Sequence, residues 1–414
     1  MGLQGIKGPS YKLVDGNAKE ILNMKKEAMS RTKSLSHDIF PVVQPQYHSW
    51  LKTYGKIFLQ WLGTEAQLVV MEPELCKEIL NNKDKVYLQM KQQGFGKKLL
   101  GNSLATSEGE QWLKLRKLAN HAFHRESLKS MVPDMIASTE KMVQRWQNSK
   151  GKEIEMYQEF KLFTSEVISR TAFGSSYLEG KKIFDMLTDL SSLLVKNSFK
   201  IRLPGIRITI DDIIDQCKAL YFAGQETTNG LLVWTVFLLA LHQDWQEEAR
   251  KEVLQLFGKQ NPNSDGISRL KTMNMIINES LRLYPPVIQL VKKAERESRL
   301  GKLIVPANID LVIPNLALHH DPQIWGQDAE LFKPERFSEG VAKATKDNMA
   351  AFIPFGMGPR ICVGYNFATT ETKIALSMIL QRYALTLSPG YVHAPLHFLT
   401  VRPQHGVQVM LHSL

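Results

Sequence analysis

The chain has few cysteines and no long hydrophobic run, and each shortage excludes a class of protein. Its 414 residues include three cysteines, Cys76, Cys217 and Cys362, which are widely spaced and odd in number. A disulfide framework or a zinc cluster is therefore excluded, and a reducing compartment is expected. The longest apolar run, Leu231–Leu241, is too short to cross a bilayer, which takes about 20 residues. We expect it to form a buried helix.

The N-terminus also lacks a targeting signal. The opening MGLQGIKGPSYKLVDG contains no apolar core of the kind that a signal peptide or a membrane anchor needs. Gly2 does not begin a myristoylation signal, because Ile6 stands where serine or threonine is required. The sequence therefore predicts a chain without an anchor of its own, either peripheral or soluble.

Basic residues outnumber acidic ones. The chain has 52 Lys and Arg against 41 Asp and Glu, a net charge of +11, and 43% of its residues are hydrophobic. Such a chain is an ordinary globular protein that is large enough to bury a cofactor. The charge favours an acidic partner or an anionic membrane surface, although a generally basic soluble protein has the same balance. We expect no nucleic-acid partner.

A glycine-rich loop, FGMGPRICVG at residues 355–364, is the main chemical signal. Its glycines, including Gly358 and Gly364, let the backbone approach a flat and bulky group closely. Arg360 can direct a cation at an anionic edge, while loop N–H groups can bond a thiolate at Cys362. These features predict a haem iron held by a cysteine thiolate. A buried structural cysteine in a glycine turn is the alternative.

Trp112 and Arg116 are four residues apart, so they share one face of a predicted helix. Alone, the pair indicates an Arg whose stem lies beside a half-buried Trp. Next to a haem loop, an indole N–H and a guanidinium instead suit the two carboxylates of a porphyrin. His121 and His124 follow closely, and we expect them to be capping or surface residues rather than iron ligands.

Apolar residues recur from about residue 209 to residue 242, which predicts a helix about 50 Å long that crosses the core. The string AGQETT lies near its middle, at residues 223–228. Glycine lowers helix stability, and a threonine hydroxyl can bond the carbonyl four residues earlier. We therefore expect a loosened helix with a groove at this point, although such a pair of features can be accidental.

Glu279 and Arg282 are three residues apart and can bond on one face of a helix. The spacing alone is a weak signal. Tyr284-Pro285 ends this helix at once, and the string PERF with Arg336 follows at residues 334–337.

Together, W-x-x-x-R, A-G-x-E-T-T, E-x-x-R, P-E-R-F and the cysteine loop, in this order, resemble the cytochrome P-450 monooxygenases over residues 50–414. The sequence around these motifs resembles plant microsomal members of the clan that oxidises terpenoids and plant hormones. The resemblance implies a mainly α fold in which a large helical domain adjoins a small β-rich lobe. It also implies one haem b between the long central helix and the helix that follows the cysteine loop.

The resemblance assigns roles to individual residues. It implies that Cys362 ligates the iron, that Thr227 stabilises the activated oxygen and that Glu226 relays protons from solvent. Glu279, Arg282 and Arg336 would form a buried network that locks the cysteine loop. The remaining cofactor-binding residues would be Trp112, Arg116, Ala223, Gly224, Phe355, Gly358, Arg360 and Gly364. Lys292 or Lys293 stands where the family often has an Arg on a haem propionate.

We expect a single domain over residues 1–414. Its β-rich lobe would span about residues 40–80, where residues 57–70 predict a hairpin, and a second hairpin is expected at residues 399–411. Further helices are expected at residues 17–34, 73–80, 128–147, 153–173, 181–196, 246–257, 273–283 and 365–383. By the resemblance, the chain is shortened near residues 206–208, where the family has further helices that cover the substrate pocket.

The resemblance implies an oxygen-inserting enzyme on the cytosolic face of the endoplasmic reticulum membrane. Its substrate would be a small hydrophobic molecule, and its electrons would come from an NADPH-cytochrome reductase that docks near Lys114, Lys117 and Arg360. One alternative is a truncated haem-binding relative with impaired catalysis. Another is a haem enzyme that isomerises or dehydrates an oxygenated substrate without a reductase, and the intact Glu226–Thr227 pair argues against it.

Overall fold

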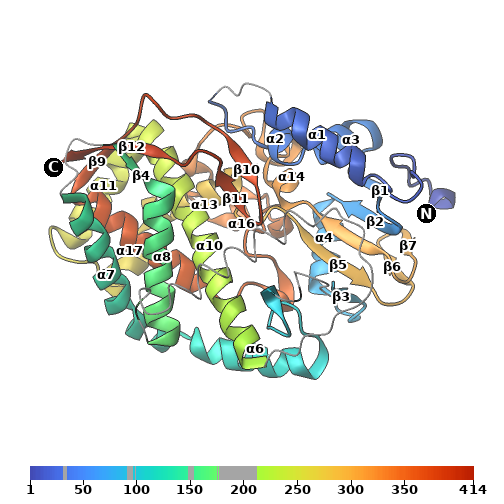
Figure 1. Ribbon diagram of the computed structural model, residues 1–414, viewed down its shortest axis with the longest axis horizontal. Coiled ribbons are helices and arrows are strands. Elements are labelled where there is room, and N and C mark those ends of the chain that lie inside the picture. The colour runs from blue at the N-terminus through green and yellow to red at the C-terminus, as the bar shows by residue number, and fades with distance from the viewer. Residues whose placement is uncertain (31–34, 91–96, 98, 148–152, 175, 177–211) are drawn as a thin grey trace.

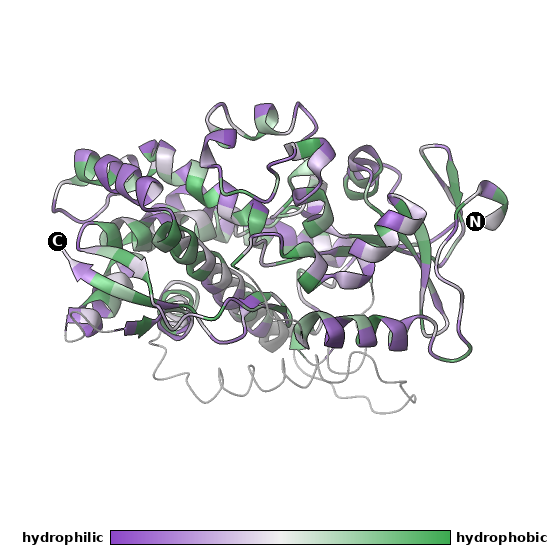
Figure 2. Cartoon of the chain, turned by 90° about the horizontal axis from the view of Figure 1, so that it is seen from above, coloured by the Kyte–Doolittle hydropathy of each residue, from purple (hydrophilic) through white to green (hydrophobic). Residues whose placement is uncertain are grey.

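The computed structural model describes residues 1–30, 35–90, 97, 99–147, 153–174, 176 and 212–414. A helical domain fills one side of the molecule and a small sheet fills the other, with the two termini at opposite ends (Figure 1). In Figure 2 the interior helices are mostly hydrophobic, whereas the outer turns are mostly hydrophilic. The expectation of a mainly α fold with a small β-rich lobe is confirmed.

Most of the long helices lie in the middle of the chain, and most of the short ones lie between α13 and α17. The helices are η1 Gly2–Gln4, α1 Ala18–Ser30, α2 Phe40–Val43, α3 Pro45–Tyr54, α4 Pro73–Asn81, α6 Gly109–Ala122, α7 Arg125–Gln147, α8 Met156–Phe173, α10 Asp212–Leu241, α11 Gln243–Phe257, α12 Ser264–Arg269, α13 Lys271–Leu283, α14 Asn315–His319, α15 Pro322–Trp325, η2 Pro334–Phe337, α16 Val341–Ala344, η3 Met349–Ala351, η4 Gly358–Arg360 and α17 Tyr365–Leu380. No helix in the described part of the chain is long and apolar enough to cross a membrane.

The strands gather into one larger sheet and three small ones. They are β1 Ile57–Leu62, β2 Glu65–Val70, β3 Tyr87–Gln89, β4 Glu153–Glu155, β5 Leu290–Ala294, β6 Ser298–Leu300, β7 Leu303–Val305, β8 Asp310–Ile313, β9 Tyr383–Leu387, β10 Pro395–His397, β11 Val401–Pro403 and β12 Gln408–Ser413. The larger sheet has the order β1-β2-β8-β5-β3. The hairpin expected at residues 57–70 is confirmed as β1–β2. Parallel pairing of β2 with β8 then brings the later strands beside it.

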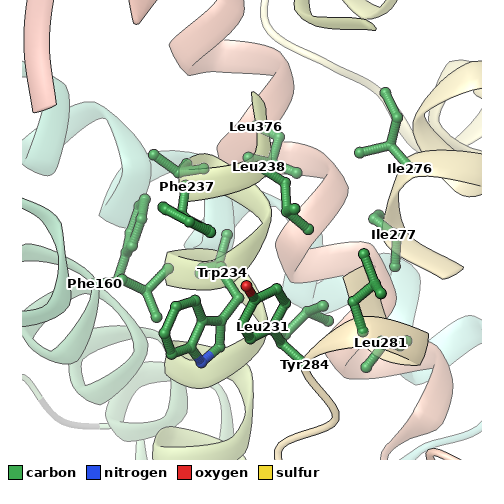
Figure 3. Packing of buried hydrophobic residues seen from close by; sticks show 14 of the residues in the cluster. Phe160, Leu231, Trp234, Phe237, Leu238, Ile276, Ile277, Leu281, Tyr284 and Leu376 are labelled. Carbon is green, nitrogen blue, oxygen red and sulfur yellow. The ribbon is translucent and has the colours of Figure 1, made fainter. Parts of the chain in front are cut away.

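The predicted long helix is α10, and it crosses the helical domain (Figure 1). Every side chain from Leu231 to Leu239 is at most 2% exposed. The ring of Trp234 stacks on Tyr284 with the centroids 4.3 Å apart, among aliphatic residues of α10 and α13 (Figure 3). Each buried apolar side chain stabilises the fold by about 1.5–3 kcal/mol, so this half of α10 is the centre of the core.

The prediction of a hairpin at residues 399–411 is wrong. Strand β11 pairs with β10, whereas β12 lies between β9 and β4 and pairs with both. Because both edges of β12 are occupied, it has no edge left for β11. Alternating apolar residues identify strands, but they do not identify which strands pair.

Several predicted boundaries shift for local reasons. The helix expected from residue 153 begins at Met156, because residues 153–155 form β4 and the Glu155 carboxylate accepts hydrogen bonds from the N–H groups of Tyr157 and Gln158. The helix expected to reach Tyr383 ends at Leu380, because Tyr383 begins β9. The helix expected at residues 181–196 and the shortened connection near residues 206–208 lie outside the described residues.

Glu279 and Arg282 form a fully buried ion pair on α13. The Arg282 guanidinium donates to both carboxylate oxygens, at 2.7 and 2.8 Å, and Arg336 lies 3.6 Å from the same carboxylate. Arg282 also donates to the carbonyl of His319 at 2.9 Å, and the Nε2 atom of His319 accepts from the Ile353 N–H at 3.0 Å. The network therefore reaches the segment that precedes the cysteine loop.

Replacing Arg282 by Ala should destabilise the protein by about 3–5 kcal/mol, because it leaves the buried Glu279 carboxylate without its partner. Urea unfolding and the yield of soluble protein would measure the loss. Arg299→Ala is the matched control, since Arg299 is exposed and bonds the nearby Gly301 carbonyl. A soluble Arg282→Ala protein with the stability of the control variant would contradict a role in folding.

Candidate active site

A cavity of about 320 Å³ lies between α10 and the loop that carries Cys362. Ala223, Gly224 and Thr227 line it from α10, and Cys362 lines it from the loop. These α10 residues are three and four positions apart, so they form one face of the helix. The two segments singled out by their motifs are more than a hundred residues apart in sequence, and they form walls of the same cavity.

The α10 wall is shaped by a glycine and two threonines. A Cβ atom at Gly224 would lie 3.0 Å from the Cδ1 atom of Ile168, so glycine lets α8 approach α10 closely at this point. The Thr227 hydroxyl donates to the Ala223 carbonyl at 2.5 Å. The buried Thr228 hydroxyl also lines the cavity and lacks a partner among the described residues.

The cysteine loop requires glycine at Gly358 for two reasons. Its φ of +73° lies in the left-handed region, and a Cβ atom there would come within 2.5 Å of the Leu80 carbonyl oxygen on α4. Further along, the Cys362 N–H donates to the Phe355 carbonyl at 2.9 Å and closes the loop. The loop therefore packs tightly against α4 and leaves Cys362 at the cavity wall.

Cys362 is accessible from the cavity but surrounded by protein on its other sides. This burial raises the pKa of its thiol, while a hydrogen bond from the Gly364 N–H and the charge of Arg116 act in the opposite direction. A bound metal cation promotes loss of the thiol proton, because the thiolate is the form that binds a metal.

Positive charge gathers at one edge of the cavity. Arg360 lines the cavity, lies over the Trp112 ring at 4.5 Å and donates to the Glu108 carboxylate at 2.5 Å. Arg116 donates to the Ile361 carbonyl at 2.6 Å. Trp112 and Arg116 thus adjoin the cysteine loop, as expected, but they are not among the residues that line the cavity.

Lys292, rather than Lys293, faces the cavity. It is 6% exposed and donates to the Gln89 side-chain oxygen at 3.0 Å. Burial, and then the charge of Arg360, lower the pKa of Lys292 to about 8. Lys293 points to the other side of β5, where it lies 3.7 Å from Asp310.

Glu226 points away from the cavity, although its neighbour Thr227 lines it. Its carboxylate accepts a hydrogen bond from the Thr400 hydroxyl at 2.9 Å and one from the Tyr157 hydroxyl at 3.4 Å. The acid lies beside the residues that line the cavity, but it is held by α8 and by the turn before β11.

The residues at the cavity fit a haem. Cys362 would hold the iron, and Arg360 and Lys292 would hold the two carboxylates of the porphyrin. The described residues contain no group of three His, Cys, Asp or Glu suited to a metal ion. In haem the macrocycle supplies most of the iron ligands, so a single protein thiolate is enough to hold it.

Comparison with known proteins decides the family. The cytochrome P-450 family model matches residues 42–206 and 202–410, which is most of the chain. The chain belongs to the cytochrome P-450 family. It is an oxidoreductase, a haem-dependent monooxygenase, and the family in general uses a redox-partner reductase and small hydrophobic substrates.

Curated plant relatives match nearly the whole chain. Cytochrome P-450 CYP749A22 of Panax ginseng is 54% identical over 474 aligned positions, which cover 99% of this chain and 90% of the relative. CYP72A219 of the same plant is 40% identical, covering 99% and 92%. Cytochrome P-450 734A1 of Arabidopsis thaliana is 36% identical, covering 99% and 91%. The resemblance to plant P-450 enzymes that the motifs indicate is thus confirmed.

Sequence patterns missed several residues of this site. Glu108 immediately precedes α6 and pairs with Arg360, and only its place four residues before Trp112 could have suggested it. Gln89, Tyr157 and Thr400 carry no motif. They lie in other elements, far from their partners in sequence, so only the fold brings them to the P-450 site.

The affinity of this P-450 for iron-free protoporphyrin should fall as the pH rises above about 8. Free Lys292 has a pKa of about 8, and a porphyrin carboxylate stabilises its charged form, so binding takes up a proton above that pH. Quenching of porphyrin fluorescence between pH 6.5 and 9.5 would measure the affinity. Lys292→Met should weaken binding at pH 7 and flatten the profile, whereas the control Lys293→Met should keep it. Equal profiles in both variants would contradict the assignment.

Proposed function

We propose that this P-450 inserts one oxygen atom of O2 into a C–H bond of a small hydrophobic molecule, with electrons from an NADPH-dependent reductase. The other oxygen atom leaves as water, and each turnover takes up two electrons and two protons. One observation carries the proposal: Cys362 and the Gly224–Thr227 face of α10 are walls of the same cavity.

The proposed cofactor is haem b, for which thiolate ligation supplies the electron density that favours O–O cleavage. The chain's own residues orient it. Arg360 and Lys292 would bind its carboxylates at one edge, and the glycines of the loop would let the backbone lie close to its face. Thr227 lies on the opposite wall, where its hydroxyl can bond oxygen or water once the bond to the Ala223 carbonyl opens.

The cavity walls suit an uncharged, hydrophobic substrate. Apart from the cationic pair at the cofactor edge, the described lining residues carry no charged side chain, and aliphatic ones dominate, including Ile168, Leu220, Leu231, Val287 and Val291. Apolar walls of this kind bind by burial and exclude ions. We therefore propose a substrate of the terpenoid or plant-hormone kind.

The proposed reductase surface is smaller than the sequence suggested. Lys114 and Lys117 are exposed on α6 and remain available to an acidic partner. Arg360 is not available to it, because Arg360 lines the cavity and its Nη2 atom donates to the Glu108 carboxylate and to the Ser107 carbonyl. A place on the cytosolic face of the endoplasmic reticulum stays a prediction of the family resemblance.

Carbon monoxide difference spectra test the proposal. The reduced, haem-loaded protein should show the red-shifted Soret band of a thiolate-ligated ferrous–CO complex, because Cys362 supplies the sulfur. Cys362→Ala should lose this band. Cys76→Ala is the control, since Cys76 is fully buried on α4 and should leave the band unchanged. A spectrum typical of histidine ligation in folded protein, the same in all three, would refute the assignment.

A second candidate is a truncated relative that binds haem but couples electrons poorly to product. Two observations support it. The two matches of the family model meet at residues 202–206, and the alignment with the ginseng relative runs over 474 positions although this chain has 414 residues. We propose that the chain lacks part of the cover of its cavity near residues 206–208. An open cavity admits water, which weakens electrostatic control of the reaction.

Restoring the missing segment should improve coupling if this second candidate is correct. A chimera would carry the corresponding segment of the ginseng relative between residues 206 and 208. Both proteins would receive reductase and the same tight-binding hydrophobic substrate, and product, NADPH consumption and hydrogen peroxide would be measured. We expect less peroxide and more product per NADPH from the chimera. Equal ratios in the two proteins would show that the shorter connection closes the cavity by itself.

A further inference from the structure

We propose that Tyr157 and Thr400 are positioning residues for the carboxylate of Glu226, and that Arg402 compensates its charge. The inference rests on the proposed function and on the role that the family resemblance implies for Glu226, which is to relay protons from solvent. In this inference, α8 and the turn before β11 help to control the protonation of that carboxylate.

Both hydroxyls bond the same oxygen of Glu226. The Thr400 hydroxyl donates to Oε1 at 2.9 Å, and the Tyr157 hydroxyl donates to Oε1 at 3.4 Å. Glu226 and Tyr157 are 9% exposed and Thr400 is 3% exposed, so the contacts are shielded from water. In place of water, the two hydroxyls satisfy the hydrogen-bonding capacity of this buried oxygen.

The turn that carries Thr400 is held firmly against α10. The Val401 N–H donates to the Pro286 carbonyl at 3.0 Å, and the Trp234 indole N–H donates to the Val401 carbonyl at 2.9 Å. In Figure 1 the strands β10 and β11 lie beside α10, which carries both Trp234 and Glu226. Thr400 therefore has a fixed place relative to the acid, and Pro286 links that place to the cavity wall.

Arg402 completes a chain of donors. Its guanidinium lies 3.8 Å from the centre of the Phe398 ring and is hydrogen-bonded to the hydroxyl of Tyr157. Burial raises the pKa of Tyr157, Glu226 raises it further, and Arg402 lowers it. The phenol thus stays neutral, accepts from Arg402 and donates to Glu226. Since Arg402 is half-buried, the chain runs from the protein surface to the acid beside the groove.

The sign of the effect follows from these contacts. A hydrogen bond to the ionised form of a carboxyl group favours that form, so loss of a donor favours the protonated form. A carboxyl group that is protonated over a wider pH range moves the lower limit of the enzyme's working pH range upward. Substrate affinity should not change, because neither hydroxyl lines the cavity.

The test is an infrared titration of the Glu226 carboxyl group in the full-length, haem-loaded protein, with its band identified by Glu226→Gln. In Tyr157→Phe and Thr400→Val the protonated carboxyl band should persist to a higher pH than in the unmodified protein, because each variant loses one hydrogen bond to the carboxylate. Thr400→Ser keeps a hydroxyl and should restore the original titration. Tyr221→Phe is the matched control, because it removes a buried 2.9 Å bond between α10 and Ser165 of α8 without contacting Glu226.

The pH profile of product formed per NADPH is the second measurement. Its acidic limb should move upward in Tyr157→Phe and Thr400→Val at unchanged KM, and should stay in place in Thr400→Ser and Tyr221→Phe. A Glu226 band that titrates alike in Tyr157→Phe, Thr400→Val and Tyr221→Phe would overturn the inference, and so would Thr400→Ser behaving as Thr400→Val. Absence of product from the unmodified protein would instead count against the proposed function, because the infrared titration needs only folded protein.

Discussion

The fold depends on an ion pair that is buried completely. Glu279 and Arg282 are both 0% exposed, and removing two charges from water costs several kcal/mol for each. The pair offsets this cost with two parallel hydrogen bonds and with three further bonds from Arg282 to the carbonyls of His319, Ala329 and Leu331. These carbonyls belong to segments that have little regular structure of their own. The pair therefore orders the backbone between α13 and the cysteine loop.

The position of Cys362 follows from this constraint and from one on the other side of the loop. The ring of His319, whose carbonyl bonds Arg282, accepts from the N–H of Ile353 just before the loop. On the opposite side, Gly358 approaches the Leu80 carbonyl more closely than any side chain would allow. Both contacts act on backbone atoms. The sulfur is consequently placed by the main chain of its surroundings, so substitutions of nearby exposed side chains should move it little.

Local patterns predicted the parts of this structure that depend on neighbours in sequence. The pairing of Glu279 with Arg282 follows from helix spacing, and the burial of residues 231–239 follows from their composition. The sequence left Lys292 and Lys293 as alternatives, since adjacent strand residues point to opposite faces and the pattern does not say which face meets the cavity. The contact of Glu226 with Thr400 spans 174 residues, so no periodicity could indicate it.

The apolar half of α10 stabilises a helix whose other half contains unpartnered polar atoms. Gln225, Thr228 and Asn229 are buried and have side-chain atoms without a partner among the described residues, and each such atom costs about 1–3 kcal/mol. The following turns, residues 231–239, are apolar apart from one threonine and fully packed, and each buried side chain contributes about 1.5–3 kcal/mol. The apolar half therefore outweighs the cost of the polar half. A helix without that packed end could not keep a glycine and two threonines at the cavity and remain a helix.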